Sequence, residues 1–397
     1  MKVLICNAGS TSLKFKLYLM PEETVLAGGN IERIRDEKGG LFRYYSADGF
    51  KEETHAVVKD YRAGIDMFLE KLCGSEHRAV EDTSEIDAVG FKTVLSKDHY
   101  GVHLMDDETI QGMRDFLSVA PAHNSHYLEA VGSFKEILPE TPMVGAFETA
   151  FHQTMPKEAY IYSGPYEWYE KYGIRRLGYH GASHSYVADC LTAELGSRYR
   201  AVSCHLGGSG SLCAIVDGKS TDTSFGMSLQ CGLPQSNRAG DIDPFIISYL
   251  MRDCGMTEKE VFDGLGKNGG LLGISGVSND LRDIEEAADT NERAKLAIDI
   301  YIREIIRYIG GYAAIMGGLD AIALTGGIGE NSLTVRNRIA EAFSYLGLKP
   351  GDEKPMKEGR HGSPGKIITS GDSAVKMFVI PANEELGIAR KVYDKLK

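Results

Sequence analysis

The sequence predicts a duplicated α/β fold, built from two domains with an active-site cleft between them. With 397 residues, the chain is longer than one ordinary hydrophobic core requires and long enough for two domains. Strand-like and helical hydrophobic patterns alternate along its length, which is typical of α/β proteins. Residues 3–19 and 200–216 also share the scheme of strand, glycine-rich turn and strand, which indicates a duplication.

The first half opens with alternating apolar and polar residues on both sides of a Gly-Ser turn. This pattern predicts a hairpin of strands at 3–7 and 13–19. The same criteria predict further strands at 24–31, 42–45, 86–94 and 143–147 and helices at 61–72 and 127–137. We expect these elements to form an N-terminal α/β domain of residues 1–149, completed by a C-terminal helix at 385–397.

The second half repeats this beginning, with a strand at 200–206, a glycine turn and a returning strand at 212–216. A long helix is expected at 292–316, because one apolar stripe at helical spacing is formed by Ile298, Ile302, Ile305 and Ile309. The remaining predicted elements are helices at 244–252, 258–264 and 335–345 and strands at 320–325 and 377–380. Together they predict a C-terminal nucleotide-binding domain of residues 150–384, joined to the first domain through a hinge.

Composition excludes several classes of partner. The formal net charge of −12 argues against a nucleic acid or an anionic membrane, since such surfaces attract an excess of Lys and Arg. The sequence has neither an apolar run long enough to span a membrane nor a signal-peptide pattern. The seven cysteines are scattered without a Cys-x-x-Cys pair, which favours reduced thiols used as small core residues. We therefore expect a soluble, cytoplasmic protein.

Three glycine turns have the composition of phosphate cradles. They are Asn7-Ala-Gly-Ser-Thr-Ser-Leu-Lys14, His205-Leu-Gly-Gly-Ser-Gly-Ser211 and Thr325-Gly-Gly-Ile-Gly-Glu-Asn331, and each offers backbone N–H groups to an anion. Singly each is a weak signal, because Gly-Ser turns are common and none has the spacing of a Walker A loop or a Rossmann fingerprint. As a set they resemble the loops of the RNase H-like ATPases, the superfamily of actin, hexokinase and Hsp70. In that superfamily two hairpin loops face the phosphates and a third holds the nucleoside.

A longer series of motifs identifies the family. In chain order they are NAGSTSLKF (7–15), APAHN (120–124), FETAFHQTMP (147–156), GYHGASHSYV (178–187), DTSFG (222–226), RAGDIDP (238–244), GLLGISG (270–276), GGIGENS (326–332) and NEELGIAR (383–390). With these motifs the chain resembles the acetate kinase family, which comprises acetate and propionate kinases (acetokinases), over essentially its whole length. So many motifs in the family's order exclude a chance resemblance.

The resemblance assigns roles residue by residue. It implies that Asn7 and Glu384 hold Mg²⁺, an ion for which hard oxygen ligands are suited. It also implies that Glu148, His180 and Arg238 are catalytic, with the last two beside the phosphoryl group in flight, where fixed donors are needed. The residues implied to contact the phosphates or the rest of ATP are Ser10, Ser12, Lys14, His205, Gly207, Gly208, Ser209, Gly210, Asp280, Arg282, Gly327, Ile328, Gly329, Glu330 and Asn331.

Structural roles are an alternative for some of these polar residues. Three histidines could have a structural role, with their hydrogen bonds satisfied inside the protein: His152, His184 and His205. For His152 and His184 this role is favoured. Arg238 could merely pair with Asp241 or Asp243, although the chemistry needs a cation beside the phosphoryl group. Glu384 could complement the dipole of the helix that follows it, a role compatible with metal binding.

The chain departs from the family pattern mainly around the substrate. The arginine expected to bind the carboxylate of the acid is here Lys92, which keeps the charge but loses the bidentate fork. The expected catalytic aspartate is Glu148, one methylene longer, so the two replacements could be partners in one rearranged site. In the nucleotide loop, Gly208 replaces an asparagine. The other residues implied to line the substrate pocket are Val94, Ala122, Tyr179 and Leu229.

The predicted function is that of an ATP-dependent kinase that phosphorylates a short-chain carboxylate, with acetate as the first candidate and propionate or a related acid as the second. The reaction would be a reversible, direct in-line transfer that gives an acyl phosphate and ADP, with Mg²⁺ as cofactor. The resemblance also implies a homodimer with its interface on the second half. Two alternatives stay open: another donor such as pyrophosphate, motivated by Gly208, and a catalytically weak paralogue with a binding or regulatory role, motivated by Lys92 and Glu148.

Overall fold

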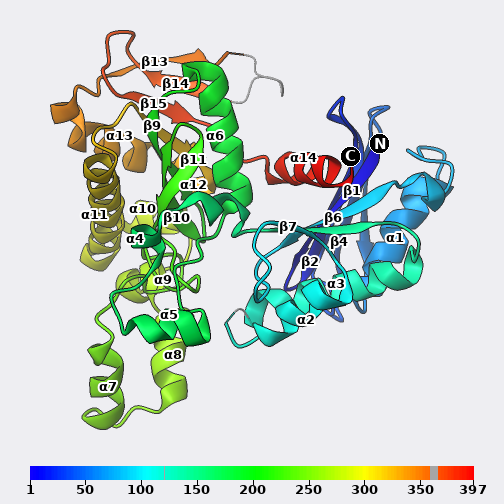
Figure 1. The fold of residues 1–397 in the computed structure, drawn as a ribbon, viewed down its shortest axis with the longest axis horizontal. Helices are drawn as coiled ribbons and strands as arrows, with labels where there is room; N and C mark the ends of the chain where they lie inside the picture. The colour runs from blue at the N-terminus through cyan, green and yellow to red at the C-terminus, as the bar shows by residue number, and fades with distance from the viewer. Residues whose placement is uncertain (120, 358–364) are drawn as a thin grey trace. The chain divides into compact units, whose positions relative to one another are not determined.

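The computed structural model describes residues 1–119, 121–357 and 365–397. The chain divides into two compact units, the first made of Met1–Gln153 with Asn383–Lys397 and the second of Thr154–Ala382 (Figure 1). The domain limits expected from the sequence, 1–149 with 385–397 and 150–384, stay predictions, as does the cleft between the domains.

The strands of the first unit are β1 (Lys2–Gly9), β2 (Ser12–Leu19), β3 (Thr24–Glu32), β4 (Gly40–Ser46), β5 (Lys51–Ala56), β6 (Ala88–Thr93), β7 (Val102–Leu104) and β8 (Met143–Phe147). They form one mixed sheet in the order β5-β4-β3-β2-β1-β6-β8-β7. Neighbouring strands within the run β5 to β1 are antiparallel, β6 and β8 continue parallel to β1, and β7 is antiparallel to β8. The central part of β1 lies in the core of the unit, where Val3, Leu4, Ile5 and Cys6 are fully buried.

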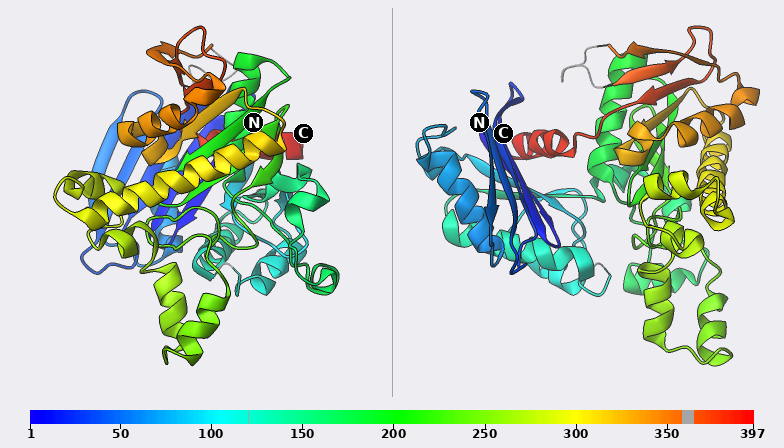
Figure 2. Two further views of the ribbon diagram at one scale, coloured as in Figure 1. Left: turned by 90° about the vertical axis from the view of Figure 1, so that its left-hand side faces the viewer. Right: turned by 180° about the vertical axis from the view of Figure 1, so that it is seen from behind.

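Helices cover both faces of this sheet. Helices α1 (Tyr61–Gly74) and α3 (Pro121–Ile137) pack on each other and on the central strands, while α14 (Glu384–Leu396) packs on β1, β6 and β8. Figure 2 shows α1 (light blue) and α14 (red) on opposite faces of the sheet. The start of α1 is fixed by Asp60, whose carboxylate accepts a hydrogen bond of 2.8 Å from the amide of Ala63. This unit also contains α2 (Asp107–Asp115) and the 3₁₀ turn Thr83–Glu85, and a second 3₁₀ turn, Ala150–Thr154, lies at its boundary with the second unit.

The strands of the second unit are β9 (Arg200–Leu206), β10 (Gly210–Val216), β11 (Lys219–Thr223), β12 (Ala321–Thr325), β13 (Pro350–Pro355), β14 (Lys366–Thr369) and β15 (Lys376–Val379). Their sheet has the order β11-β10-β9-β12-β15-β14-β13. The run β11-β10-β9-β12-β15 matches β3-β2-β1-β6-β8 of the first unit in order, and the strand directions also match, with two antiparallel pairs followed by two parallel ones. The predicted duplicated α/β fold is thereby confirmed.

The long helix α11 (Glu292–Ile315) provides much of the core of the second unit. Its predicted isoleucine stripe is confirmed, because these side chains are 0 to 5 % exposed: Ile298, Ile302, Ile305 and Ile309. Each such side chain contributes about 1.5–3 kcal/mol by leaving water. The other helices are α4 (Lys157–Tyr160), α5 (Tyr166–Tyr172), α6 (Gly181–Leu195), α7 (Phe245–Arg252), α8 (Glu258–Gly266), α9 (Gly270–Ser275), α10 (Leu281–Ala287), α12 (Gly326–Asn331), α13 (Leu333–Ala342) and the 3₁₀ turn Ser344–Leu346.

Several elements differ from the sequence expectation. Helix α6 is not predicted, because it is buried on most sides and so has no polar face to set against an apolar stripe. The third glycine segment is a short helix, α12, rather than a turn. The predicted helix at 335–345 begins earlier and ends at Ala342, where a 3₁₀ turn takes over.

Two sequence expectations concern the cysteines and the absence of a membrane-spanning segment. All seven cysteines lie in the described ranges and are free thiols, and the buried ones are Cys6, Cys190, Cys204 and Cys213. Burial raises the pKa of the thiols of Cys6, Cys204 and Cys213. In residues 1–119, 121–357 and 365–397, none of the helices has both the length and the apolarity that a membrane span requires. The cytoplasmic location stays a prediction.

Candidate active site

The β1–β2 hairpin presents polar side chains at its turn. Gly9 pairs with Ser12 across the turn, and a Cβ atom on Gly9 would lie 2.7 Å from the Ser12 hydroxyl oxygen, so a larger residue would force that hydroxyl to move. Ser10 and Lys14 are exposed and Ser12 is half-buried. The hairpin thus offers the hydroxyl and ammonium groups that the sequence assigns to phosphate.

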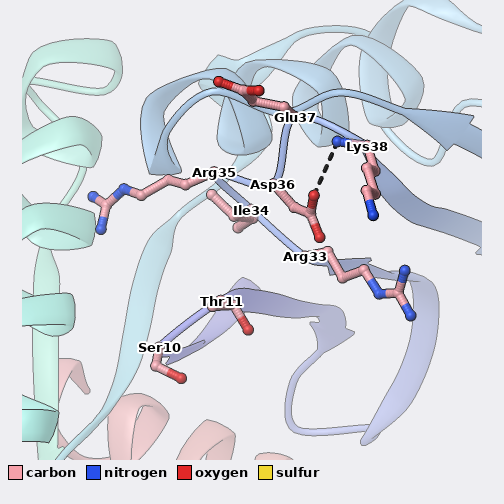
Figure 3. Close-up of a pocket in the computed structure, with 8 residues that line it drawn as sticks. All are labelled: Ser10, Thr11, Arg33, Ile34, Arg35, Asp36, Glu37 and Lys38. Carbon is pink, nitrogen blue, oxygen red and sulfur yellow. Dashed lines mark hydrogen bonds between the residues drawn. The ribbon is translucent and has the colours of Figure 1, made fainter.

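A pocket of about 800 Å³ lies beside this turn. Figure 3 shows Ser10 and Thr11 on one side and the segment from Arg33 to Lys38 on the other. In that segment Asp36 accepts a hydrogen bond of 2.9 Å from the backbone amide of Lys38, and Arg35 extends away to pair with Glu129. Of the predicted phosphate-contacting residues, Ser10 lines this pocket. The segment from Arg33 to Lys38, which forms the opposite wall, is not predicted from the sequence.

Three parallel strands of the first unit end beside one another. Asn7 lies near the end of β1 and Lys92 near the end of β6, while Glu148 directly follows β8. The registers place Cys6 beside Phe91 and Lys92 beside Ala146, so the polar residues gather at the carboxyl edge of the sheet. In α/β proteins this edge is the usual place for ligands.

Lys92 forms an ion-pair cluster with two carboxylates at this edge. Its Nζ atom donates a hydrogen bond of 2.6 Å to Oε2 of Glu384, in the first turn of α14, and lies 3.5 Å from Oε1 of Glu148. The side chains of Lys92 and Glu384 are 19 % and 15 % exposed, and that of Glu148 is 4 % exposed. Lys92 and Glu148, which replace the arginine and aspartate of the family pattern, therefore lie side by side as an ion pair.

Burial and charge act together on this cluster. Burial of the carboxyl group raises the pKa of Glu148, and the positive charge of Lys92 offsets this only in part. Burial alone would lower the pKa of Lys92, but the negative charges of Glu384 and Glu148 outweigh it and raise that pKa well above its ordinary value. Lys92 is accordingly a stable cation in an acidic environment.

The oxygen atoms around Lys92 fit a hard divalent cation. Both carboxylate oxygens of Glu148 are buried without a hydrogen bond from any described residue, and such orphaned oxygens suit Mg²⁺. Asn7 Oδ1 accepts a hydrogen bond of 2.9 Å from the Tyr127 hydroxyl and keeps a second lone pair. Across the described residues no group of three or more His, Cys, Asp or Glu has metal-binding geometry. An ion held by Asn7 and Glu384 would therefore take its other ligands from water and phosphate oxygens, as Mg²⁺ prefers.

The residues expected around the acid occupy different units. Val94 is buried in the first unit, and the side chain of Ala122 lies outside the described residues. In the second unit Tyr179 is fully buried and its hydroxyl donates to the carbonyl of Met227. Leu229 is half-buried, and its carbonyl oxygen serves as a hydrogen-bond acceptor for the arginine considered below.

His180 stands at the start of α6 in a constrained position. Its backbone is in the left-handed region, with φ of 57°, an uncommon conformation for a residue other than glycine. The ring lies between His205, at 4.1 Å between centroids, and Phe225, at 5.2 Å. Its Nδ1 atom is 2.9 Å from the Ser211 hydroxyl oxygen. Packing and hydrogen bonding thus fix the imidazole of His180.

The structure leaves Arg238 without a carboxylate partner among the described residues. Its Nη1 donates a hydrogen bond of 2.9 Å to the carbonyl of Leu229, and burial without a compensating charge lowers its pKa. Asp241 instead accepts from Tyr308 and pairs with Arg307. The alternative that Arg238 merely pairs with a neighbouring aspartate is therefore wrong in this structure.

A second pocket of about 800 Å³ brings predicted nucleotide-contacting residues of the second unit together. It joins the glycine turn after β9, the start of α10 and helix α12. Gly326, which begins α12, has φ of 79°, and a Cβ there would lie 2.7 Å from the Leu206 carbonyl oxygen, so this approach needs glycine. The predicted residues that line the pocket are Gly207, Gly208, Asp280, Arg282, Gly327, Ile328 and Asn331.

Other predicted nucleotide-contacting residues lie outside this lining. Glu330 turns back to accept hydrogen bonds of 3.0 Å from the amides of Gly326 and Ala382, and Ser209 donates to Gln235. The remaining ones outside it are His205, Gly210 and Gly329. The sequence prediction misses the lining residues Ser236, Asn279, Glu285 and Ser332. For Ser332 the signal exists, because it ends the GGIGENS motif.

The predicted structural histidines are both buried. His184 is fully buried and contacts two serine hydroxyls. His152 is fully buried as well, and its ring lies 5.9 Å from that of Phe151.

Comparison with known proteins identifies the family of the chain. Residues 2–390 match the model of the acetokinase family. Over 395 residues, which cover 98 % of both chains, the sequence is 43 % identical to the acetate kinases of Clostridium botulinum (strain 657 / Type Ba4) and Shouchella clausii (strain KSM-K16). Among solved structures, the acetate kinase of Porphyromonas gingivalis is 34 % identical with a TM-score of 0.86 and full coverage of both chains. A propionate kinase of Francisella tularensis is 32 % identical with a TM-score of 0.87 and 98 % coverage of both chains. The chain therefore belongs to the acetokinase family.

Proposed function

We propose that this protein transfers the γ-phosphoryl group of ATP to the carboxylate of a short-chain acid and so forms an acyl phosphate and ADP. Acetate is the first candidate and propionate the second, since the relatives above carry these two names. The observation that carries the proposal is Lys92, an ammonium group at the carboxyl edge of the first sheet with donors to spare, in a chain of this family.

Lys92 can bind the carboxylate of the acid. An ammonium group has three N–H donors, and one of them is used in the 2.6 Å hydrogen bond to Glu384. The 3.5 Å separation from Glu148 is an ion pair without hydrogen-bond geometry. The remaining donors are therefore available to a carboxylate, which Lys92 would hold as a point charge and not as a fork.

His180 and Arg238 can stabilise the phosphoryl group during transfer. A carboxylate oxygen attacks the γ-phosphorus, and the bond to the β–γ bridging oxygen breaks, leaving ADP. The acid is ionised at neutral pH, so no general base has to remove a proton. Arg238 has five N–H donors and uses one on Leu229. Fixed donors of this kind stabilise the charge on the equatorial oxygens.

For the cofactor we propose Mg²⁺, held by Asn7 and Glu384. The ion would neutralise charge on the phosphate oxygens when bound. Glu148, whose oxygens accept no hydrogen bond from the described residues, would then act as a positioning group beside Lys92 or the ion.

The pocket of the second unit supports a nucleotide as the donor. The apolar residue Ile328 stands beside Gly207, Gly208 and Gly327 in its lining, a combination suited to a base and its phosphates and unnecessary for pyrophosphate. We therefore favour ATP over the alternative donor, and a kinase over a weak paralogue.

We also propose a homodimer that forms through α7 and α8 of the second unit. Large apolar side chains are exposed there, with Phe245 at 80 %, Tyr249 at 59 % and Phe262 at 52 %. Monomeric proteins rarely expose such groups together, and a second copy of the chain would cover them.

A substrate panel tests the proposed reaction. The full chain is incubated with ATP, Mg²⁺, hydroxylamine and linear acids of one to six carbons, and acyl hydroxamate is measured. We expect product with acetate or propionate and a decline with longer acids. Absence of product with every acid would overturn the proposal.

A further inference from the structure

A chain of hydrogen bonds leads from His180 into the interior of the second unit. Nδ1 of His180 and Nε2 of His184 each lie 2.9 Å from the same atom, the hydroxyl oxygen of Ser211. On the far side of His184, Nδ1 lies 2.8 Å from the hydroxyl oxygen of Ser203. The chain therefore runs His180–Ser211–His184–Ser203.

The residues of this hydrogen-bonded network lie in strands and helices of the second unit or directly beside them. Ser203 is in β9, Ser211 in β10 and His184 in the first turns of α6. Ser203, Ser211 and His184 are 0 % exposed and His180 is 8 % exposed. The inner members are thus shielded from bulk water, and their polar atoms need hydrogen bonds from within the protein.

Counting protons limits the arrangements of this hydrogen-bonded network. A serine hydroxyl has one proton to donate and two lone pairs that accept, and a neutral imidazole has one N–H donor and one acceptor nitrogen. If His184 donates from Nε2 to Ser211, then Ser211 donates its proton to Nδ1 of His180, and Ser203 donates to Nδ1 of His184. A neutral His180 then carries its own proton on Nε2. In the opposite direction, and also when both imidazoles donate to Ser211, a neutral His180 carries its proton on Nδ1 and none on Nε2.

We propose that His184 is a positioning residue, which acts through Ser211 to hold His180 as the tautomer protonated on Nε2. This inference rests on the proposed function, in which His180 faces phosphoryl oxygens. Those oxygens only accept hydrogen bonds, so His180 must offer an N–H to them. Through the Ser211 hydroxyl, His184 determines which ring nitrogen of His180 carries the proton, although His184 itself does not contact the substrate.

The tautomer can be read directly in the ligand-free full chain. The protein is labelled with ¹⁵N-histidine, and long-range ¹H–¹⁵N spectra are recorded above pH 8, with His180 assigned from a His180→Asn variant. The unmodified protein should show His180 with a protonated Nε2. Ser211→Ala and His184→Phe should each shift His180 toward a mixture of tautomers. A matched hydroxyl deletion on α6, Thr192→Ala, should leave its spectrum unchanged, because Thr192 bonds the Ala188 carbonyl outside the chain.

Kinetics provide the second readout. Ser211→Ala and His184→Phe should lower kcat about 100-fold, with KM for ATP nearly unchanged. His184→Gln should recover much of the loss, because its amide can donate to Ser211. If His184→Phe does not fold, Ser211→Ala carries the test, since it removes a single oxygen atom.

The outcomes separate the two proposals. A His180 protonated on Nδ1 alone, or a tautomer that does not change in Ser211→Ala, would overturn the positioning role whatever the activity. The expected spectra in a protein that phosphorylates no acid would instead overturn the proposed function and leave the hydrogen-bonded chain intact.

Discussion

The ammonium group of Lys92 lies 2.6 Å from the carboxylate of Glu384, a residue 292 positions further along the chain. This contact ties the first turn of the C-terminal helix α14 to the carboxyl end of β6 in the first unit. It also links the residue proposed to bind the acid to a residue proposed to bind Mg²⁺.

Removing the charge of Lys92 should destabilise the first unit. In Lys92→Met the carboxylates of Glu384 and Glu148 lose their partner in a largely buried site, and we expect the free energy of unfolding to fall by about 3 kcal/mol. Urea unfolding measures this. The matched control is Lys16→Met, since Lys16 lies 3.6 Å from Glu385 and is more exposed, at 31 %; it should cost less than about 1 kcal/mol. Equal losses in the two variants would contradict the assigned cluster.

Lys92 and Glu148 should be energetically coupled. The two replaced side chains lie 3.5 Å apart, so Lys92→Arg crowds a site shaped by glutamate, and Glu148→Asp opens a gap beside lysine. Each single variant should lower kcat/KM for acetate, and the double variant should recover part of the loss, with a coupling of at least about 1 kcal/mol. Combining Glu148→Asp with the distant Lys71→Arg should give additive effects. Additivity in both pairs would disprove the coupling.

Arg238 should matter for catalysis and little for stability. Its guanidinium makes one hydrogen bond, to the Leu229 carbonyl, and no ion pair with the described residues. We expect Arg238→Ala to lower kcat by about 10³-fold or more, while the free energy of unfolding changes by about 1 kcal/mol or less. Arg252→Ala, at an exposed position of α7, should change neither. A large stability loss with an unchanged kcat would show that Arg238 is structural.

The exposed face of α7 should hold the homodimer together. Placing a charge in an apolar interface by Phe245→Asp should give a monomer in multi-angle light scattering at micromolar concentration. Leu333→Asp changes an equally apolar residue of the second unit, 66 % exposed on α13, and should leave the dimer intact. A dimer that survives Phe245→Asp would mean that another surface forms it.

The sequence predicts elements well where their hydrophobic pattern is one-sided or strictly alternating. The hairpin of β1 and β2 and the stripe of α11 are of this kind. Helix α6 escapes prediction because it is buried on most sides. Strands β5 and β13 are exposed along most of their length and have the polar sequences KEETHA and PGDEKP, so no alternation marks them.

Site residues are predictable where a motif carries them, and less so where only folding brings them together. Asn7 and Glu148 stand in motifs and Lys92 in a predicted strand, but their meeting at one sheet edge follows from the strand order. The bond from Tyr127 to Asn7 spans 120 residues, and no local pattern encodes it. Ser211 lies in a predicted glycine turn, yet its position between two histidines depends on the pairing of β9 with β10 and on the docking of α6.

The most direct test of the proposed reaction is its stoichiometry. The full chain is incubated with ATP, Mg²⁺ and acetate or propionate, and ADP and acyl hydroxamate are measured in the same samples. We predict one hydroxamate for each ADP, and neither product when the acid is omitted. ADP released at the same rate without acid, or ADP released with no hydroxamate, would contradict a kinase that phosphorylates carboxylates.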